Sequence, residues 1–257
     1  MSKPRRTVKA DHAWKPPHGN RMHAIRMRLR AYYGVPLPKP HHDPVGELVL
    51  TVLSQNTNDR NRDVAFCRLE ERWSSWDEVR AAPVEEIEAA IAPGGISKVK
   101  SARIKQILDR VATDRPPVTA GDGRPSSRGI GSGGTDPGGV DLGWMATAPL
   151  DVSRDYLCTL PGVARKTAAC VLLFAYGLPD IPVDTHVGRV GTRLALYRDG
   201  AGFEEMHDTL LAITAPDLAH ETHVNLIRHG RRLCHARAPR CGVCPLREIC
   251  PSAGTVG

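Results

Sequence analysis

The stretch LPGVARKTAACVLLFAYGLPDIPVDTHVGRV, residues 160–190, decides the fold of this 257-residue chain. Its proline and glycine at positions 161 and 162 end one helix and allow a tight hairpin turn. A second helix is predicted from Arg165 to Tyr176, because apolar residues recur there at i, i+3, i+4 and i+7. The members of this buried stripe are Ala168, Val171, Leu172 and Ala175. The stretch therefore predicts two helices packed about a tight turn.

The start of the second helix is predicted to bind a phosphate group. The first N–H groups of a helix have no intrahelical acceptor, and the positive end of the helix dipole lies there. Gly162 and Ala164 are small enough for a phosphate to approach, and Arg165 follows them. Lys166 lies at the same end, where its neutral amine would be a nucleophile for a carbonyl-like carbon. An exposed lysine that only touches a phosphate is the alternative.

An acidic residue follows in an apolar neighbourhood. Asp184 stands in IPVDTHVGRV, and its carboxylate could stabilise a developing positive charge or carry a proton. It could equally cap the next helix, since aspartate is a preferred residue at that position. His186 is a candidate phosphate contact, with a structural hydrogen bond as the alternative.

The remainder of the chain predicts an all-α fold with many short helices, because no alternating strand pattern persists. Asp43 and Pro44 introduce the apolar run VGELVLTVLSQ, which suits a buried helix, although its valines and threonine leave a strand open. Residues 116–139 are rich in glycine, serine and proline and predict a flexible insertion. Residues 1–19 predict a mobile basic tail.

Four cysteines close together near the end predict a metal centre. Cys234, Cys241, Cys244 and Cys250 are spaced C-x6-C-x2-C-x5-C. Four thiolates in so short a span suit a [4Fe–4S] cluster or a zinc site, and a single C-x2-C unit favours iron–sulfur. The remaining cysteines, Cys67, Cys158 and Cys170, are predicted to lie in the core.

Composition indicates an ordinary soluble protein with a polyanionic partner. The chain is 41% hydrophobic and 25% charged, and its formal net charge is +7. A basic balance favours nucleic acid, although an anionic membrane surface fits the same charge. No segment is apolar over the length that spans a bilayer, and the N-terminus lacks a secretory signal. We therefore expect no membrane partner and a cytoplasmic, nucleoid-associated location.

Residues 160–190 resemble the helix-hairpin-helix and Gly-Pro-Asp region of the endonuclease III family of DNA glycosylases. With the cysteine array included, the resemblance runs from about Asp43 to Cys250, apart from the insertion. It implies an all-α fold of two helical domains with a cleft between them, and Lys166 and Asp184 facing each other across it. It also implies a [4Fe–4S] cluster on the four cysteines, which would hold Arg237 and Arg240 in a basic loop against DNA.

The resemblance divides the chain into three segments. Residues 1–39 carry the basic tail and an N-terminal helix that belongs to the cluster domain. Residues 40–178 form a helical-barrel domain with the hairpin and the insertion, which lies at about 116–140. Residues 179–257 form the cluster domain. Two positions depart from the family pattern: Ala164 replaces a glycine, and Ala238 stands where relatives often have lysine.

Two loops of the family contact the bases. LSQNTND, residues 53–59, resembles a loop that contacts the base left behind, so Gln55 and Asn56 are candidates to fill the space of an extruded base. Asn56 replaces the usual glutamine. GGISKVKSARIK, from Gly94, resembles a second loop and makes Ile96 a candidate apolar wedge. The basic residues that follow it could line a phosphate track or a solvated helix face: Lys98, Lys100, Arg103 and Lys105.

The resemblance implies a bifunctional glycosylase and abasic-site lyase that removes oxidised pyrimidines from double-stranded DNA as a monomer. Lys166 would attack the sugar, and Asp184 would assist loss of the base. A mismatch adenine glycosylase is one alternative, although such enzymes usually lack the hairpin lysine and carry a glutamate where this chain has Thr51. A non-catalytic DNA-damage-binding protein of the same fold is another, because Asn56, Ala164 and Ala238 depart from the family.

Overall fold

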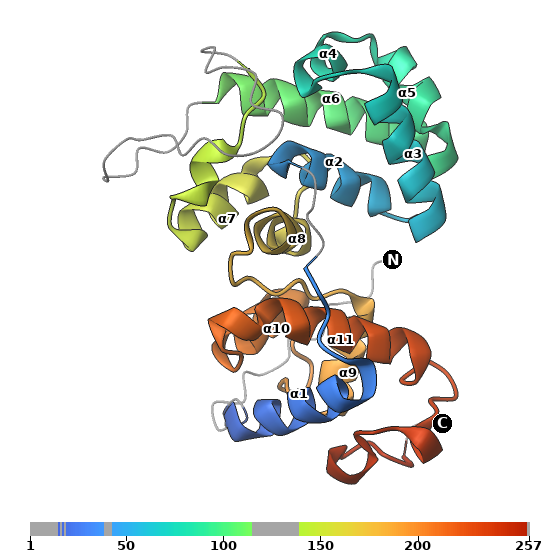
Figure 1. Cartoon of the computed structure of the whole chain (residues 1–257), viewed down its shortest axis with the longest axis vertical. Coiled ribbons are helices and arrows are strands. Elements are labelled where there is room, and N and C mark those ends of the chain that lie inside the picture. The colour runs from blue at the N-terminus through green and yellow to red at the C-terminus, as the bar shows by residue number, and fades with distance from the viewer. Residues whose placement is uncertain (1–14, 16, 18, 39–42, 115–138, 256–257) are drawn as a thin grey trace, which may run out of the picture. The chain divides into compact units, whose positions relative to one another are not determined.

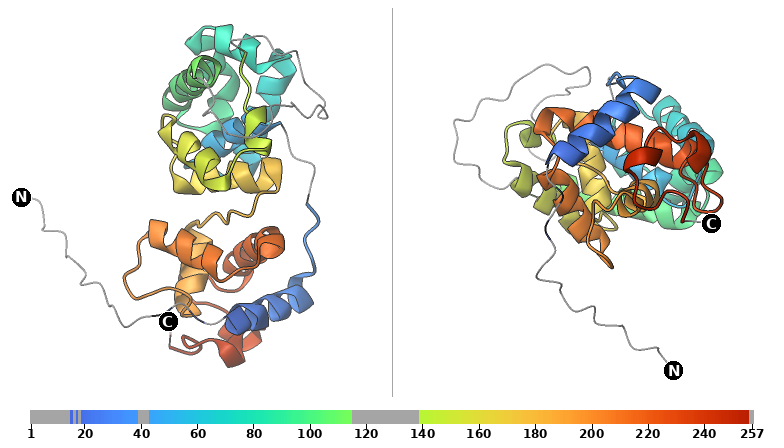
Figure 2. Two further views of the ribbon diagram at one scale, coloured as in Figure 1. Left: turned by 90° about the vertical axis from the view of Figure 1, so that its left-hand side faces the viewer. Right: turned by 90° about the horizontal axis from the view of Figure 1, so that it is seen from below.

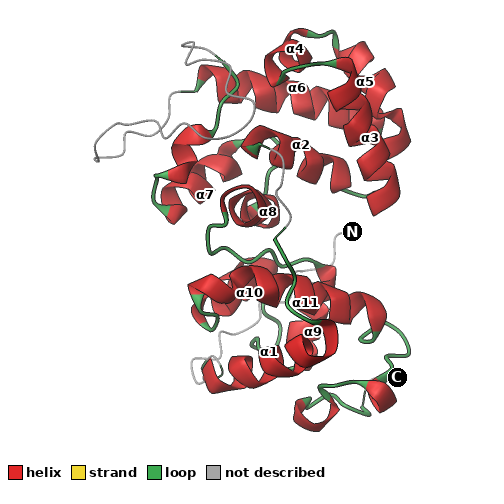
Figure 3. Ribbon diagram, in the orientation of Figure 1, coloured by secondary structure: helices red, strands yellow, loops and turns green. Residues whose placement is uncertain are grey.

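The computed structural model describes residues 15, 17, 19–38, 43–114 and 139–255. These residues form helices joined by loops, with no strand among them (Figure 3). The prediction of an all-α fold is confirmed. The basic tail lies almost wholly outside the described residues, and so does the glycine-rich insertion.

The chain folds into two compact units. One is continuous, residues 38–180, and the other combines residues 1–37 with residues 181–257. We call them the continuous unit and the split unit. The sequence predicts boundaries at residues 39/40 and 178/179.

The continuous unit is a bundle of seven α-helices in its described part (Figure 1). In chain order these are α2 (Pro44–Ser54), α3 (Asp59–Arg72), α4 (Trp76–Ala81), α5 (Val84–Ile91), α6 (Ser97–Thr113), α7 (Leu150–Thr159) and α8 (Arg165–Tyr176). The short 3-10 turns η1 (Ala92–Gly94) and η2 (Gly143–Ala146) precede α6 and α7. Helix α2 packs against α3, α6 and α8, so it forms the centre of the bundle.

Helix α2 shows how local chemistry starts an element. The side chain of Asp43 accepts a hydrogen bond of 2.8 Å from the N–H of Gly46, and Pro44 occupies the first turn. Both features favour a helix start. The apolar run that left a strand open is therefore helical.

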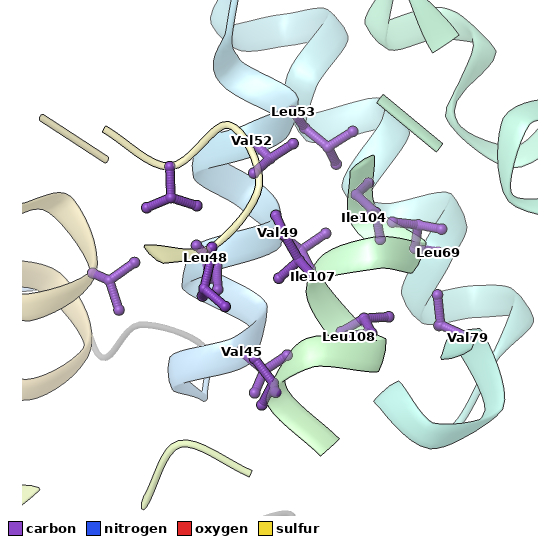
Figure 4. Packing of buried hydrophobic residues seen from close by; sticks show 14 of the residues in the cluster. Val45, Leu48, Val49, Val52, Leu53, Leu69, Val79, Ile104, Ile107 and Leu108 are labelled. Carbon is purple, nitrogen blue, oxygen red and sulfur yellow. The ribbon is translucent and has the colours of Figure 1, made fainter. Parts of the chain in front are cut away.

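The core of the continuous unit forms where α2 meets α6. Leu48, Val49, Ile107 and Leu108 are each at most 1% exposed, and their side chains interdigitate (Figure 4). Burial of such a side chain contributes about 1.5–3 kcal/mol, so this contact stabilises the unit together with the packing of α2 against α8 and of α5 against α6.

The cysteines outside the C-terminal array lie in different environments. Cys170 is buried, as predicted, but Cys67 and Cys158 are exposed. Their helices α3 and α7 turn other residues inward: Ala65, Phe66, Leu69, Ser153 and Leu157. The prediction of core positions for Cys67 and Cys158 is wrong, because each lies on the solvent side of an amphipathic helix.

The split unit consists of α1 (Gly19–Tyr33), α9 (Thr185–Arg193), α10 (Phe203–Ala212), α11 (Ala219–Arg232) and the 3-10 turns η3 (Pro216–Leu218), η4 (Cys241–Val243) and η5 (Arg247–Ile249). Helix α11 packs against both α1 and α9 (Figure 2). In the described part of the chain, no helix combines the length and apolarity that a membrane span requires.

An ion-pair network joins the N-terminal helix to the rest of the split unit. Glu221 of α11 is buried and accepts hydrogen bonds from Arg26, at 3.5 Å, and from Arg30. The Arg30 hydrogen bond, with the charges of both arginines, holds the pKa of Glu221 below its usual range despite burial. This contact fixes α1 although it lies about 190 residues away in sequence.

We expect Glu221→Gln to lower the thermal unfolding midpoint at pH 7, because two arginines then lose their counter-charge. The lowered pKa means that the unfolded state takes up a proton first as the pH falls. The stability from this carboxylate is thus present above about pH 4.3, and it is lost as the pH falls through the folded-state pKa. The difference between variant and wild type should therefore shrink below about pH 4. A constant difference from pH 7 to pH 3, measured by circular dichroism, would contradict this account.

Candidate functional site

The hairpin between α7 and α8 needs glycine at one position only. Gly162 has a φ of +70°, and a Cβ there would lie 2.3 Å from Nε of Arg103. Ala164 has a φ of −102°, an ordinary value for an alanine, and it is exposed. The departure from a second glycine therefore costs the turn no backbone strain.

Helix α8 begins with its N–H groups free of a side-chain cap. Ala164 occupies the cap position and offers no side-chain acceptor, and the first α-helical bond joins the N–H of Ala168 to its carbonyl at 3.0 Å. The N–H groups of the preceding helical residues have no intrahelical acceptor. Small residues and unpaired amides make this turn suitable for an anion.

Arg165 does not have the predicted environment. Its side chain is buried, and Nη1 donates to Oδ2 of the fully buried Asp180 at 2.5 Å. Arg165 was predicted to contact a DNA phosphate, and this prediction is wrong because the guanidinium neutralises a core carboxylate. The pair fastens the start of α8 to the segment that follows the helix.

Lys166 is half-buried in the first turn of α8. Among the described residues of the continuous unit, its Nζ has no hydrogen-bond or ion-pair partner. An amine that is partly withdrawn from water and held by no carboxylate of its unit remains available for a ligand.

Gln55 follows α2 and bridges two other segments. Its Nε2 donates to the carbonyl of Gly162 at 3.3 Å, and its Oε1 accepts from Nη1 of Arg103 at 2.6 Å. Arg103 itself packs against Gly162. The structure thus brings Gln55 to the hairpin turn through contacts that the sequence did not indicate.

Asn56 and Ile96 share an unusual backbone conformation. Asn56 has a φ of +52° and Ile96 a φ of +51°, and both side chains are exposed. Asparagine adopts this left-handed region fairly readily, whereas a β-branched residue rarely does. Ile96 is 54% exposed, so the alternative of a core isoleucine is wrong. Backbone strain of this kind concentrates at functional sites.

Two lysines of α6 point inward rather than toward a phosphate track. Nζ of Lys100 donates to the carbonyls of Leu53, at 2.7 Å, and Gly94, at 2.9 Å, and burial lowers its pKa. Nζ of Lys105 donates to the carbonyls of Arg80 and, at 2.8 Å, Ala82. Both ammonium groups are occupied by backbone, so the predicted phosphate track does not include them.

Asp184 caps α9 with one of its two oxygens. Oδ1 accepts from the N–H groups of His186, at 2.9 Å, and Val187, at 2.7 Å. Both bonds use the same oxygen, so Oδ2 is free to act on a ligand. Burial, with a smaller contribution from the Asp184 charge, raises the pKa of Tyr197 above its usual range. Asp184 therefore caps α9 through Oδ1 alone.

His186 makes the structural hydrogen bond that was its alternative role. Its Nδ1 lies 3.1 Å from Nη2 of Arg189. The same side chain packs closely on Gly230, where a Cβ would lie 2.9 Å from Cβ of His186. This packing fixes the imidazole at the start of α9.

The four C-terminal cysteines line one cavity in the split unit, together with apolar residues that include Val190, Leu194 and Leu246. No three His, Cys, Asp or Glu side chains of the described residues stand close enough to hold a single metal ion. A tetrahedral zinc ion would hold its sulfurs about 3.8 Å apart. An iron–sulfur cubane instead places one thiolate on each of four irons and spreads them further. Four cysteines that line one cavity fit an iron–sulfur cluster.

Neighbouring groups hold these sulfurs in place. Nη1 of Arg193 donates to Sγ of Cys234 at 3.3 Å, and the N–H of Leu246 donates to Sγ of Cys244 at 3.4 Å. Such bonds stabilise thiolates that ligate a cluster. Arg193 also donates to the carbonyl of His235 at 2.6 Å, so one side chain fixes both a ligand and the following loop.

The loop between the first two cysteines exposes its basic side chains. Arg237 and Arg240 are both exposed, and Ala238 between them has a φ of +47°. The backbone at Ala238 is in the left-handed region, which turns the loop sharply. A basic loop of this kind is suited to a polyanion.

Two family models match the chain. Residues 49–216 match the HhH-GPD superfamily of base excision DNA repair proteins. Residues 234–250 match the iron–sulfur binding domain of endonuclease III, and they begin and end at cysteines of the array. The cofactor of this chain is accordingly a [4Fe–4S] cluster.

Known proteins are similar over most of the chain. Endonuclease III of Bacillus subtilis is 30% identical over 210 residues, which cover 82% of each chain. Endonuclease III of Escherichia coli K12 is 43% identical over 97 residues, which cover 38% of this chain and 46% of the relative. A trapped covalent intermediate of endonuclease III with DNA has a TM-score of 0.72 at 27% identity, over 93% of this chain and 98% of that one. The chain therefore belongs to the HhH-GPD superfamily, as an endonuclease III-like base excision repair DNA glycosylase.

Proposed function

We propose that this protein is a bifunctional glycosylase and abasic-site lyase that removes oxidised pyrimidines from double-stranded DNA. The observation that carries the proposal is the environment of Lys166. Its amine is half-buried beside an exposed anion-binding turn and has no partner among the described residues of its unit. A structural lysine would be paired, as Lys100 is.

The chemistry follows from an amine near an extruded nucleotide. Nζ of Lys166 attacks C1′ of the deoxyribose, and the bond from C1′ to the damaged base breaks with its electron pair. Nitrogen then gives up one of its two protons, which passes to O4′ as the C1′–O4′ bond breaks, and an iminium remains at C1′. Removal of a proton from C2′ then expels the 3′ phosphate and cleaves the strand, and water later releases the lysine.

Asp184 would supply the negative charge that the reaction needs. Its Oδ1 is occupied by two backbone N–H groups, so the carboxylate is fixed in direction. Its free Oδ2 would stabilise positive charge on the sugar and assist departure of the base. Capping and catalysis would use different oxygens of one side chain.

Recognition would be divided among several contacts. The hairpin amides at Gly162 and Ala164 would bind a phosphate without reading sequence. Asn56 and Ile96 would enter the duplex, since both are exposed in a strained conformation. Gln55 is already bonded to the hairpin and would act as its support.

The split unit would contribute further DNA contacts. His186 would reach a phosphate through the nitrogen that Arg189 leaves free. Arg237 and Arg240 would neutralise the backbone from the loop that Cys234 and Cys241 hold. The resemblance to DNA complexes of endonuclease III supports this assignment.

The alternative of a mismatch adenine glycosylase requires a catalytic glutamate that this chain does not have at the corresponding position. Thr51 stands where such enzymes carry a glutamate, and it is buried with its hydroxyl donating to Glu47 at 3.2 Å. The non-catalytic alternative rested partly on Ala164, whose backbone is unstrained. Neither alternative has an observation in its favour.

The first test replaces the nucleophile. With DNA that contains thymine glycol or an abasic site, borohydride should trap wild type as a covalent adduct, and Lys166→Ala should give no adduct. Loss of the attacking nitrogen removes the covalent bond itself. Lys105→Ala removes an α6 lysine whose ammonium is bonded to backbone carbonyls, so it is the matched control and should trap normally. An equal adduct yield in wild type and Lys166→Ala would rule out this nucleophile, and a panel of oxidised pyrimidines and mismatches would define the lesion.

Asp184→Asn separates catalysis from capping. Asparagine is as good a cap as aspartate, so the unfolding midpoint should change little. Removal of the charge should slow single-turnover base excision by about 10²–10⁴-fold. If the rate changes less than about threefold while the protein stays folded, the carboxylate only caps the helix.

Cys244→Ser tests the cluster ligands. We expect the variant to lose iron, sulfide and visible absorbance, because a serine hydroxyl is a poor substitute for a thiolate. Binding of undamaged duplex should weaken about 10-fold or more at moderate salt, since the basic loop loses its anchor. Retention of full iron content, or zinc in place of iron, would contradict this assignment.

A further inference from the structure

Lys100 connects the two loops that carry Asn56 and Ile96. The residue is 2% exposed, and its ammonium donates to the carbonyls of Leu53 and Gly94. Leu53 lies in the last turn of α2, three residues before Asn56, and Gly94 ends η1, two residues before Ile96. One buried cation therefore ties together the stems of both loops.

The contact has a physical reason on each side. Carbonyls at the end of a helix lack intrahelical donors, and a cation there is favoured by the helix dipole. A buried ammonium in turn needs acceptors, because an unpaired charge in the core is very costly. The main-chain N–H of Lys100 also donates to the carbonyl of Ile96 at 3.1 Å, so the residue holds the second loop from two sides.

We infer that Lys100 is a positioning residue for base extrusion, which holds Asn56 and Ile96 at the spacing that lets both enter the duplex together. The inference rests on the proposed function. Both residues adopt a left-handed backbone that must be imposed by their surroundings. Without the ammonium, no side chain joins the carbonyls of Leu53 and Gly94, so the loop with Asn56 and the loop with Ile96 can change conformation independently.

The chain supplies a matched control on the same helix. Lys105 also donates through Nζ to two backbone carbonyls, those of Arg80 and Ala82, between α4 and α5. Lys100→Met and Lys105→Met each remove one ammonium and leave two carbonyls without that donor. A general loss of stability should therefore affect both variants, whereas loss of loop spacing should affect Lys100→Met alone.

The experiment measures extrusion and chemistry separately in the full-length holoprotein. A 2-aminopurine opposite thymine glycol reports unstacking through its fluorescence, and borohydride trapping on an abasic duplex reports Lys166 without a base to extrude. We expect the fluorescence rise of Lys100→Met to be at least fivefold smaller than that of wild type. Its single-turnover excision rate should be at least tenfold lower. Trapping on the abasic duplex should stay within threefold of wild type, and Lys105→Met should match wild type in all three.

Two results would overturn the inference. One is an equal fluorescence rise in Lys100→Met and Lys105→Met, and the other is a fall in abasic trapping as large as the fall in excision. Absence of trapping by wild type would instead refute the proposed lyase, whatever the fluorescence shows. Should Lys100→Met fail to fold, Lys100→Gln, which keeps a polar N–H group but removes the charge and shortens the side chain, is judged by the same criteria.

Discussion

The buried ion pair between Arg165 and Asp180 sets the direction of Lys166. Successive residues of a helix point about 100° apart, so a helix that buries Arg165 cannot also bury Lys166 on the same side. The pair is fully enclosed and joins the first turn of α8 to the segment after the helix. Together with the buried residues that follow it, from Thr167 to Leu173, the ion pair holds the first turn of α8 in place, and the neighbouring Lys166 stays half-buried. Arg165, beside the lysine, thus stabilises the fold through Asp180 and does not contact DNA.

Most helices could be predicted from the sequence because their signals are local. The turn at Gly162, the apolar stripe of α8 and the Asp43 cap each depend on residues within one or two turns. Helix α4 was not predicted, since it is only six residues long, three of them are charged, and only Val79 is buried. Cys67 and Cys158 were placed in the core because cysteine is usually buried, but the helix face decides the burial of a single residue.

The candidate site was less predictable, because its supporting contacts join distant segments. Arg103 reaches Gln55 across 48 positions, and Lys100 reaches Leu53 across 47. A side chain that donates to a backbone carbonyl leaves no pattern in the acceptor's sequence, since every residue has a carbonyl. Charge alone therefore left four basic residues of α6 as candidates for a phosphate track or a solvated helix face, while the structure turns the ammonium groups of Lys100 and Lys105 inward. The hairpin turn could be predicted because its shape depends only on residues that are neighbours in the sequence.

The left-handed residues connect these contacts to function. Four non-glycine residues in the described part of the chain have a positive φ, and three of them, Asn56, Ile96 and Ala238, lie in loops assigned to DNA. Each such residue costs about 1–3 kcal/mol, and the cost persists only where neighbouring structure imposes it. Lys100 provides that constraint for the first two, and the anchored cysteine loop provides it for the third. A rigid loop loses little conformational entropy when it enters a duplex, so more of the contact energy remains for extrusion of the base. The strained backbone at these loops therefore lowers the stability of the free protein, and in return the loops already have the conformation that binds DNA.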